Sequence, residues 1–181
     1  MVGTMTCGNS KGLLVPHTTT EYELEHIKRK LPKDIKVEKI NDVFTALGNC
    51  IACNDSVALI HPEMSEDTEK IIAETLQVTV IRSTIAGNPL VGTYCHISNN
   101  AMLVHPSCGL SGIQRLVDLT KVPVCSGTIN KGEGYVGSGL VANDSCAFVG
   151  QISTATEISI IDALFRFNET KDDNAIPFEW D

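Results

Sequence analysis

The chain has 181 residues, and 43% of them are hydrophobic, which is enough to bury the core of one domain. Its formal net charge of −8 and a sequence pI of about 5.1 argue against a nucleic-acid groove, because an acidic surface repels phosphate. No apolar run reaches the roughly 18 residues of a membrane span, and the start "MVGTMTCGNSKG" lacks a basic, signal-like segment, so we expect a cytoplasmic or nuclear protein without membrane contact.

One short pattern occurs four times along the chain. Each copy opens with polar residues and continues into an apolar run that predicts a buried strand: "GNSKGLLVP", "CNDSVALIHP", "SNNAMLVHP" and "ANDSCAFVG". The central apolar residues of these runs follow one another at intervals of 44 or 45 residues: Leu14, Leu59, Leu103 and Phe148. A glycine stands eleven residues before each of them: Gly3, Gly48, Gly92 and Gly137. Two landmarks in the same phase predict four structural repeats.

A helix is predicted after the buried strand in every repeat. Three repeats match the capping-box pattern, in which a hydroxyl and a carboxyl or amide group three residues later satisfy the first amides: Thr20 with Glu23, Ser111 with Gln114, and Thr154 with Glu157. Ser65 lacks that partner but is followed by Glu66 and Asp67, which favour a helix N-terminus. Short β-rich runs follow three of the helices, at residues 35–40, 78–83 and 122–127. Each repeat therefore predicts the order strand, strand, helix, strand.

The repeats predict a single α/β domain over residues 1–165, with units at about 2–46, 47–90, 91–135 and 136–165. One unit of this size cannot bury both its sheet face and its helix, so neighbouring units must cover each other. A closed ring would cover the terminal units as well. Residues 166–181 break the period and are acidic, so we expect a disordered tail, with Phe178 and Trp180 as candidate docking residues.

The seven cysteines indicate reduced thiols, because an odd number does not complete a disulfide framework. Cys50 and Cys53 form one close pair, "CIAC". A tetrahedral zinc site needs further ligands, which the sequence does not place nearby, and residues three apart on a strand point to opposite faces. We therefore predict no metal site and no cofactor.

Longer stretches of the sequence are similar to one known family. "GNSKGLLVP", "ALGNCIACNDSVALIHP", "LVGTYCHISNNAMLVHP", "VPVCSGTIN" and "LVANDSCAFVGQISTATEIS" resemble the translation initiation factor 6 family over roughly residues 2–165. The resemblance implies a pentein fold, which is a rosette of five α/β units around a pseudo-fivefold axis. It also implies binding to the intersubunit face of the large ribosomal subunit, participation in maturation of that subunit, and prevention of premature joining with the small subunit. Release by a GTPase and its cofactor, and a location in cytoplasm and nucleolus, follow from the same resemblance.

Family members carry a further segment before the position that matches Met1, and this segment supplies the first unit and the start of the second. Four units are recognisable here, where the resemblance implies five. An open remnant would expose apolar edges worth many kcal/mol at about 25 cal/mol per Å². We therefore expect that a front segment is missing; the alternative is a gap that is tolerated in a complex or an oligomer.

The periodic glycines predict a binding face. Repeated units arranged around an axis place equivalent residues at the same level along that axis. The residues after the glycines are therefore expected to surround the axis on one face of the molecule. These residues differ between repeats, as individual contacts on a common scaffold should: Thr4, Asn49, Thr93 with Tyr94, and Ser138. The resemblance implies that this face meets a protein of the large ribosomal subunit; Asn49 and Tyr94 match the family, and Thr4 stands where many members have arginine. The alternatives are glycines that only form turns and a Tyr94 that belongs to the core.

Three further features predict structure more than function. Asparagines at the start of the buried strands are expected to tie backbone amides together around the axis: Asn9, Asn54, Asn99 and Asn143. The segment "EHIKRK" predicts a solvated helix face and little direct contact with nucleic acid. "GEGYVGSG" contains G-x-G-x-x-G without the strand–helix context of a nucleotide site, so we interpret it as a hairpin between the third and fourth units.

An enzyme hypothesis rests on Cys146 with His61 or His105, because the pentein fold also houses guanidine-modifying enzymes that use a cysteine nucleophile and a histidine. Against it, His61 and His105 occupy the same place in successive repeats, which indicates scaffold symmetry. Cys146 lies in the apolar run "SCAFVG", where burial in a strand would disfavour a thiolate. We therefore predict no catalytic residue. A non-ribosomal scaffold descended from the family is a third hypothesis.

Overall fold

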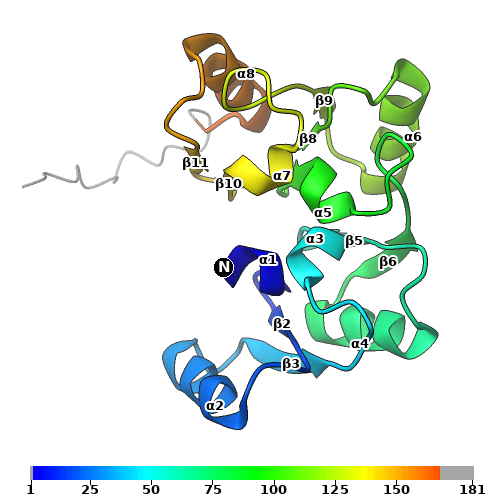
Figure 1. Ribbon diagram of the computed structural model, residues 1–181, viewed down its shortest axis with the longest axis vertical. Helices are drawn as coiled ribbons and strands as arrows, with labels where there is room; N and C mark the ends of the chain where they lie inside the picture. The colour runs from blue at the N-terminus through cyan, green and yellow to red at the C-terminus, as the bar shows by residue number, and fades with distance from the viewer. Residues whose placement is uncertain (1, 168–181) are drawn as a thin grey trace, which may run out of the picture.

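The computed structural model describes residues 2–167, which form four similar units in an arc around a central axis (Figure 1). Unit 1 contains α1 (Val2–Met5), β1 (Cys7–Gly8), β2 (Gly12–Pro16), α2 (Glu21–Lys30) and β3 (Lys36–Ile40). Unit 2 contains α3 (Leu47–Cys50), β4 (Ile51–Cys53), β5 (Val57–Ile60), α4 (Glu66–Leu76) and β6 (Thr79–Arg82). Unit 3 contains α5 (Val91–Tyr94), β7 (Cys95–Ile97), β8 (Met102–Val104), α6 (Leu110–Thr120) and β9 (Val124–Ser126). Unit 4 contains α7 (Val136–Gly139), β10 (Leu140–Ala142), β11 (Ala147–Val149) and α8 (Ala155–Phe165).

Each unit has its own small sheet. The first two strands form an antiparallel hairpin, and in units 1 to 3 the third strand runs parallel to the second. In the described part of unit 4 the sheet consists of β10 and β11. A four-residue helix precedes every hairpin. The sequence did not predict these helices, because such a short glycine-containing helix has no periodic signal of its own. The expected tail at residues 168–181 lies outside the described residues.

The predicted helix starts are confirmed in three units. Complete capping boxes join Thr20 to Glu23 in α2 and Thr154 to Glu157 in α8, and the Ser65 side chain accepts a hydrogen bond from the Thr68 amide in α4. The capping prediction for Ser111 was wrong. Helix α6 starts at Leu110 with Gly109 as its N-cap, so Ser111 already lies inside the first turn.

The hydrophobic core lies between units. Helix α4 packs on β2 and β3 of unit 1, and α8 packs on β8 of unit 3. One buried cluster joins Leu14 and Ile40 of unit 1 to Ile72 and Leu76 of α4, and similar clusters link units 2 and 3 and units 3 and 4. Each sheet is therefore covered by the helix of the next unit, as the repeat pattern requires.

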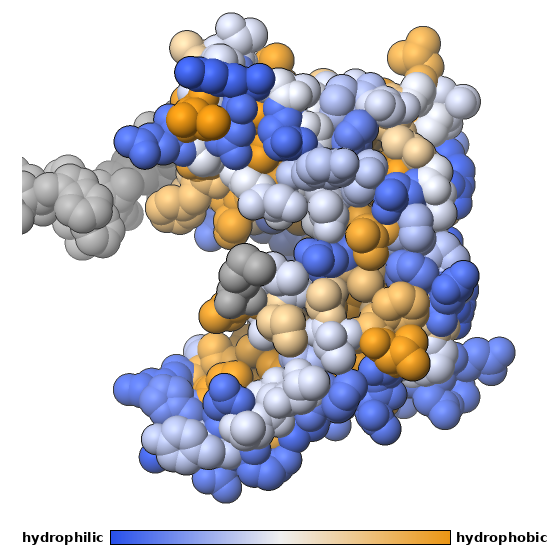
Figure 2. Space-filling model, in the orientation of Figure 1, coloured by the Kyte–Doolittle hydropathy of each residue, from blue (hydrophilic) through white to orange (hydrophobic). Residues whose placement is uncertain are grey.

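The two ends of the arc lack such a cover. Phe148 is 74% exposed, although it occupies the position of the central strand residues Leu14, Leu59 and Leu103, which are 0% exposed. At the other end, α2 contains no buried residue, whereas α4, α6 and α8 each bury apolar side chains. The space-filling view shows a notch between units 1 and 4 with apolar surface along it (Figure 2). The described units thus form an open arc.

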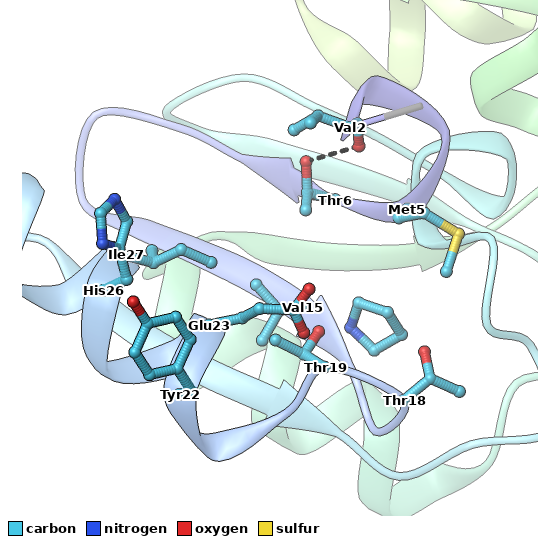
Figure 3. Close-up of a pocket in the computed structure, with 11 residues that line it drawn as sticks. Val2, Met5, Thr6, Val15, Thr18, Thr19, Tyr22, Glu23, His26 and Ile27 are labelled. Atoms are coloured by element: carbon cyan, nitrogen blue, oxygen red, sulfur yellow. Dashed lines mark hydrogen bonds between the residues drawn. The ribbon is translucent and has the colours of Figure 1, made fainter.

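An apolar groove of about 520 Å³ marks the unit 1 end of the arc, between α1, β2 and α2 (Figure 3). Its apolar lining includes Val2, Met5, Val15, Tyr22 and Ile27. The residues of unit 2 that are equivalent to Val2, Met5, Val15 and Ile27 are all buried in one cluster: Leu47, Cys50, Ile60 and Ile72. Leu14 and Ile40 of the preceding unit belong to the same cluster. The groove is therefore the surface that a preceding unit covers elsewhere in the molecule.

Two negative findings apply to residues 2–167. None of their helices is both long enough and apolar enough to cross a bilayer. No three histidine, cysteine, aspartate or glutamate side chains in this part of the chain gather in a way that could hold a metal ion.

Candidate functional site

The four short helices lie side by side around the axis. Helix α1 contacts α3, α3 contacts α5, and α5 contacts α7 (Figure 1). The structure therefore brings together the site positions that the glycine period predicted. We call this surface the axial rim and define it as residues 3–4, 48–49, 92–94 and 137–138.

Three of the periodic glycines, Gly48, Gly92 and Gly137, are required by contact between neighbouring helices. A Cβ atom at Gly48 would overlap the carbonyl oxygen of Gly3, and Gly92 and Gly137 have the same relationship to the glycine of the preceding unit. None of these glycines has a positive φ, because each lies inside a helical turn. The hypothesis that they serve only as turn formers is thus corrected, whereas their contact with an external partner stays a prediction. They let helix backbones pack against one another.

The residues after the glycines share one backbone conformation but differ in exposure. The amides of Asn49, Thr93 and Ser138 each donate to the carbonyl three residues earlier, at 2.9–3.0 Å. Ser138 is exposed, whereas Thr4, Asn49 and Thr93 are partly buried. Within residues 2–167 the hydroxyl of Thr93 is buried without a hydrogen-bond partner. The axial rim therefore offers Ser138 and the partly buried Thr4 and Asn49 on a regular backbone platform, whereas the Thr93 hydroxyl is enclosed.

An aromatic cluster extends the axial rim beside α5. The ring of Tyr94 stacks on His105 with centroids 4.8 Å apart, and its edge contact with Tyr135 has a centroid distance of 5.2 Å. A hydrogen bond with Tyr135, with a smaller effect of burial, raises the pKa of Tyr94. Tyr94 also packs against the core between units 2 and 3, which supports the core hypothesis for this residue, while its role in binding stays a prediction. Tyrosine clusters with one polar, exposed side are typical of protein interfaces.

Sequence reasoning missed His105 and Tyr135 as members of this surface. The hairpin register contained the signal for His105, because Cys95 pairs with Val104 and this places Tyr94 opposite His105. Tyr135 precedes α7, a helix that carries no local signal. Gly134 lies beneath the cluster, where an ideal Cβ would come within 2.6 Å of His105 Nε2.

The hairpin turns lie at the other end of the strands and hold the units together. Asn54 Oδ1 accepts from the amides of Ser56 and Val57, both at 2.9 Å, and its Nδ2 donates to Ser98 O of the next unit at 3.1 Å. Asn9 forms the same bonds within its own turn and donates to Asn54 O at 3.1 Å. The structural role predicted for these two asparagines is confirmed.

Asn99 also ties a backbone amide between units, since its Oδ1 accepts from the Asp55 amide at 2.9 Å, but it stands one residue past the position equivalent to Asn54. Ser98 opens the turn of unit 3, and Asn99 takes the position of Asp55, where its Nδ2 donates to Asp55 at 2.9 Å and to Asp144 at 2.7 Å. The interval between units 2 and 3 is 44 residues, so the position equivalent to Asn54 is Ser98. Asn143 accepts from the amides of Ser145 and Cys146 inside its own turn.

The structure does not bring the enzyme candidates together. Cys146 is exposed at the end of a turn, so the prediction that it lies in a buried strand was wrong. His61 and His105 follow β5 and β8 at the opposite end of the strands, and each ring accepts an amide hydrogen bond from two residues later at 3.1 Å. The hairpin interpretation of residues 132–139 holds only at their start, where an antiparallel bridge between Ile129 and Glu133 closes a turn that includes Gly132; α7 occupies Val136–Gly139.

Comparisons with known proteins agree with the resemblance. Residues 1–164 match the model of the eIF-6 family. Eukaryotic translation initiation factor 6 of Tetrahymena thermophila is 49% identical over 174 residues, which cover 96% of this chain and 71% of that protein. The factor of the same name from Schizosaccharomyces pombe is 46% identical over 171 residues, covering 94% of this chain and 70% of that protein.

Among solved structures, a DDAH from Pseudomonas aeruginosa superimposes with a TM-score of 0.53 at 12% identity. The match covers 91% of this chain and 64% of that protein. At this identity the likeness concerns the fold alone. The predicted pentein-type α/β repeat fold is confirmed.

Proposed function

Because the chain belongs to the eIF-6 family, we propose that it acts in translation initiation by binding the intersubunit face of the large ribosomal subunit. In this position it prevents premature joining with the small subunit and takes part in maturation of the large subunit. It works by occupying the surface and needs no chemistry of its own. A location in the cytoplasm and the nucleolus belongs to the same proposal.

The observation that supports this proposal is the construction of the axial rim. Four helices are fixed against one another by glycine contacts, so their backbones leave little freedom for adjustment. The side chains on this platform differ: Thr4, Asn49, Thr93 and Ser138, with Tyr94 beside them. A preorganised surface with individual side chains loses little conformational entropy on binding, which favours a specific macromolecular partner.

We propose a protein of the large subunit as the main contact. The chain carries a net charge of −8, so it is repelled by exposed RNA and attracted to a basic ribosomal protein. Release then requires an energy source outside this chain, and a GTPase-type factor would supply it. An enzyme function is disfavoured because Cys146 and the histidines lie at opposite strand ends and the shared fold with DDAH carries no activity with it.

Light scattering of ribosomal subunit joining tests the proposal. Purified large subunits are incubated with the protein and then mixed with small subunits. The expected result is a decrease in the amplitude of joining that saturates at one protein per large subunit. In the control, the protein is first incubated with small subunits, which offer no binding site for it, and large subunits are added afterwards. Full joining amplitude in the presence of excess protein would overturn the proposal.

A further inference from the structure

Neighbouring units repeat one side-chain contact at the axis. The register pairs Cys7, Ala52 and His96 with the central residue of the following strand, so these three positions are equivalent. Each of them faces the first hairpin strand of the next unit. His96 Nε2 lies 2.8 Å from the carbonyl oxygen and 3.0 Å from the amide nitrogen of Ala142. Ala52 and Ile97, at the equivalent junction, belong to one buried cluster.

At the junction between units 1 and 2 the same geometry places two thiols in contact. Cys7 Sγ lies 3.4 Å from Cys53 Sγ, although the two residues are 46 positions apart. Cys53 Sγ also lies 3.4 Å from Gly8 O, and Cys7 Sγ lies 3.7 Å from Ile51 O, so each sulfur sits against the opposite strand. Both cysteines are free and partly exposed, in contrast to the buried Cys50, Cys95 and Cys108.

We propose that Cys7 and Cys53 are an oxidation site at which a peroxide forms a reversible disulfide between units 1 and 2. A disulfide needs sulfurs about 2 Å apart, so small rotations of two side chains that already touch suffice. Both cysteines are partly exposed as residues, and this gives a small oxidant access to the pair. The contact is fixed by the packing of the repeats, and it therefore does not depend on a flexible loop.

The reaction balances with hydrogen peroxide as the oxidant. One thiolate attacks the peroxide, giving a sulfenic acid while the other oxygen leaves as water after taking up a proton. The second thiol attacks the sulfenic sulfur, the S–S bond forms, and a second water leaves. Two thiols and one peroxide thus give one disulfide and two waters. A hydrogen bond with Cys7 and burial raise the pKa of Cys53. A dithiol reductant reverses the reaction by thiol–disulfide exchange.

The disulfide would tie unit 1, at one end of the arc, to unit 2. Helix α2 buries no residue, so the helix of unit 1 has fewer packing contacts than the helices of units 2 and 3. Because β1 follows α1 and β4 follows α3, the covalent link lies directly behind the contact between Gly3 and Gly48. Local opening of unit 1 would then be restricted in the oxidised protein.

Mass spectrometry of the native protein tests this proposal. The protein is treated with hydrogen peroxide, its remaining thiols are blocked with N-ethylmaleimide, and it is digested without reduction. The expected product is a peptide containing Cys7 linked to one containing Cys53, with fragment ions that exclude Cys50. Cys146→Ser, which removes an exposed thiol, should leave this product unchanged, and dithiothreitol should remove it. Sulfinic acids or scattered linkages in place of the Cys7–Cys53 product would overturn the proposal.

A thermal measurement provides a second readout. Oxidation should raise the melting temperature of the wild-type protein by several °C, because the cross-link restricts the unfolded chain. Cys7→Ala introduces the residue found at the equivalent position 52, and this variant should fold but show no such shift on oxidation. An equal shift in wild type and Cys7→Ala would contradict the assignment of the site.

Discussion

The backbone of Gly48 in α3 lies so close to the carbonyl oxygen of Gly3 in α1 that no side chain fits between them. Gly3 itself has nothing within 4 Å of its Cβ position, because it stands at the open end of the arc. Packing therefore requires glycine at position 48 but not at position 3, and substitution by alanine should distinguish the two positions.

Gly48→Ala should destabilise the protein by about 2 kcal/mol or more, because the added methyl group forces α1 and α3 apart. Gly3→Ala is the matched control, and it should be neutral or slightly stabilising, since alanine favours a helix by up to about 1 kcal/mol and meets no neighbour. Urea unfolding of both variants measures the difference. Equal effects of the two substitutions would mean that the glycine contact is not the constraint.

Asn54→Ala should cost more than Asn143→Ala. Both side chains accept two amide hydrogen bonds within their own turns, but Asn54 also donates to Ser98 O in the next unit and is buried. The loss of this bond between units should add about 1–2 kcal/mol to the cost of the Asn54 variant. Chemical denaturation tests the comparison, and the same loss in both variants would refute a role of Asn54 between units.

Leu59→Ala and Phe148→Ala test the open end of the arc. Leu59 is 0% exposed, so its truncation should cost about 2–5 kcal/mol. Phe148 is 74% exposed at the equivalent position, and its truncation should change stability by less than about 1 kcal/mol while reducing binding of a hydrophobic dye. A large loss of stability in Phe148→Ala would show that something covers β10 and β11 in solution.

Protonation of the Glu157 carboxylate should lower the stability of the protein at acidic pH. Hydrogen bonds from the Thr154 amide, then from Gly132 and Thr128, lower the pKa of this carboxylate from 4.5 to about 2. The folded state binds the proton more weakly than the unfolded state, so the contribution of Glu157 is complete above pH 4.5 and is lost as the pH falls toward about 2.

The variant Glu157→Gln measures this contribution. At pH 7 it should unfold at a lower denaturant concentration than the wild type. The difference between the two unfolding midpoints should become smaller between pH 5 and pH 3. Glu74→Gln, at an exposed position of α4, serves as the control and should follow the wild type throughout. A midpoint difference that does not change with pH would contradict the role of Glu157 in the pH dependence of stability.

Much of the fold could be predicted from the sequence because the repeats carry local signals. Leu14, Leu59 and Leu103 are buried as predicted, and the capping residues Thr20 and Thr154 start their helices. Contacts between units have no such signal. The short helices, the packing of Gly48 against Gly3 and the place of Tyr135 depend on neighbouring repeats, and the one-residue shift at Ser98 is visible only in the hydrogen bonds.

The sequence predicted how the candidate site residues are arranged but not why the glycines are needed there. The glycine period correctly placed Asn49, Thr93 and Ser138 on one surface, because equivalent residues of a repeat must lie at equal height. It gave no reason for the glycines themselves, and it did not reveal the stack of Tyr94 on His105.

Cosedimentation with purified large ribosomal subunits tests the central claim most directly. The wild type is compared with Asn49→Arg and Ser138→Arg on the axial rim, and with Ser56→Arg at the exposed turn end as the control. Wild type and Ser56→Arg should pellet equally with the subunits, while both rim variants, checked for unchanged melting, should bind at least about tenfold more weakly. Undiminished binding of both rim variants would contradict the account.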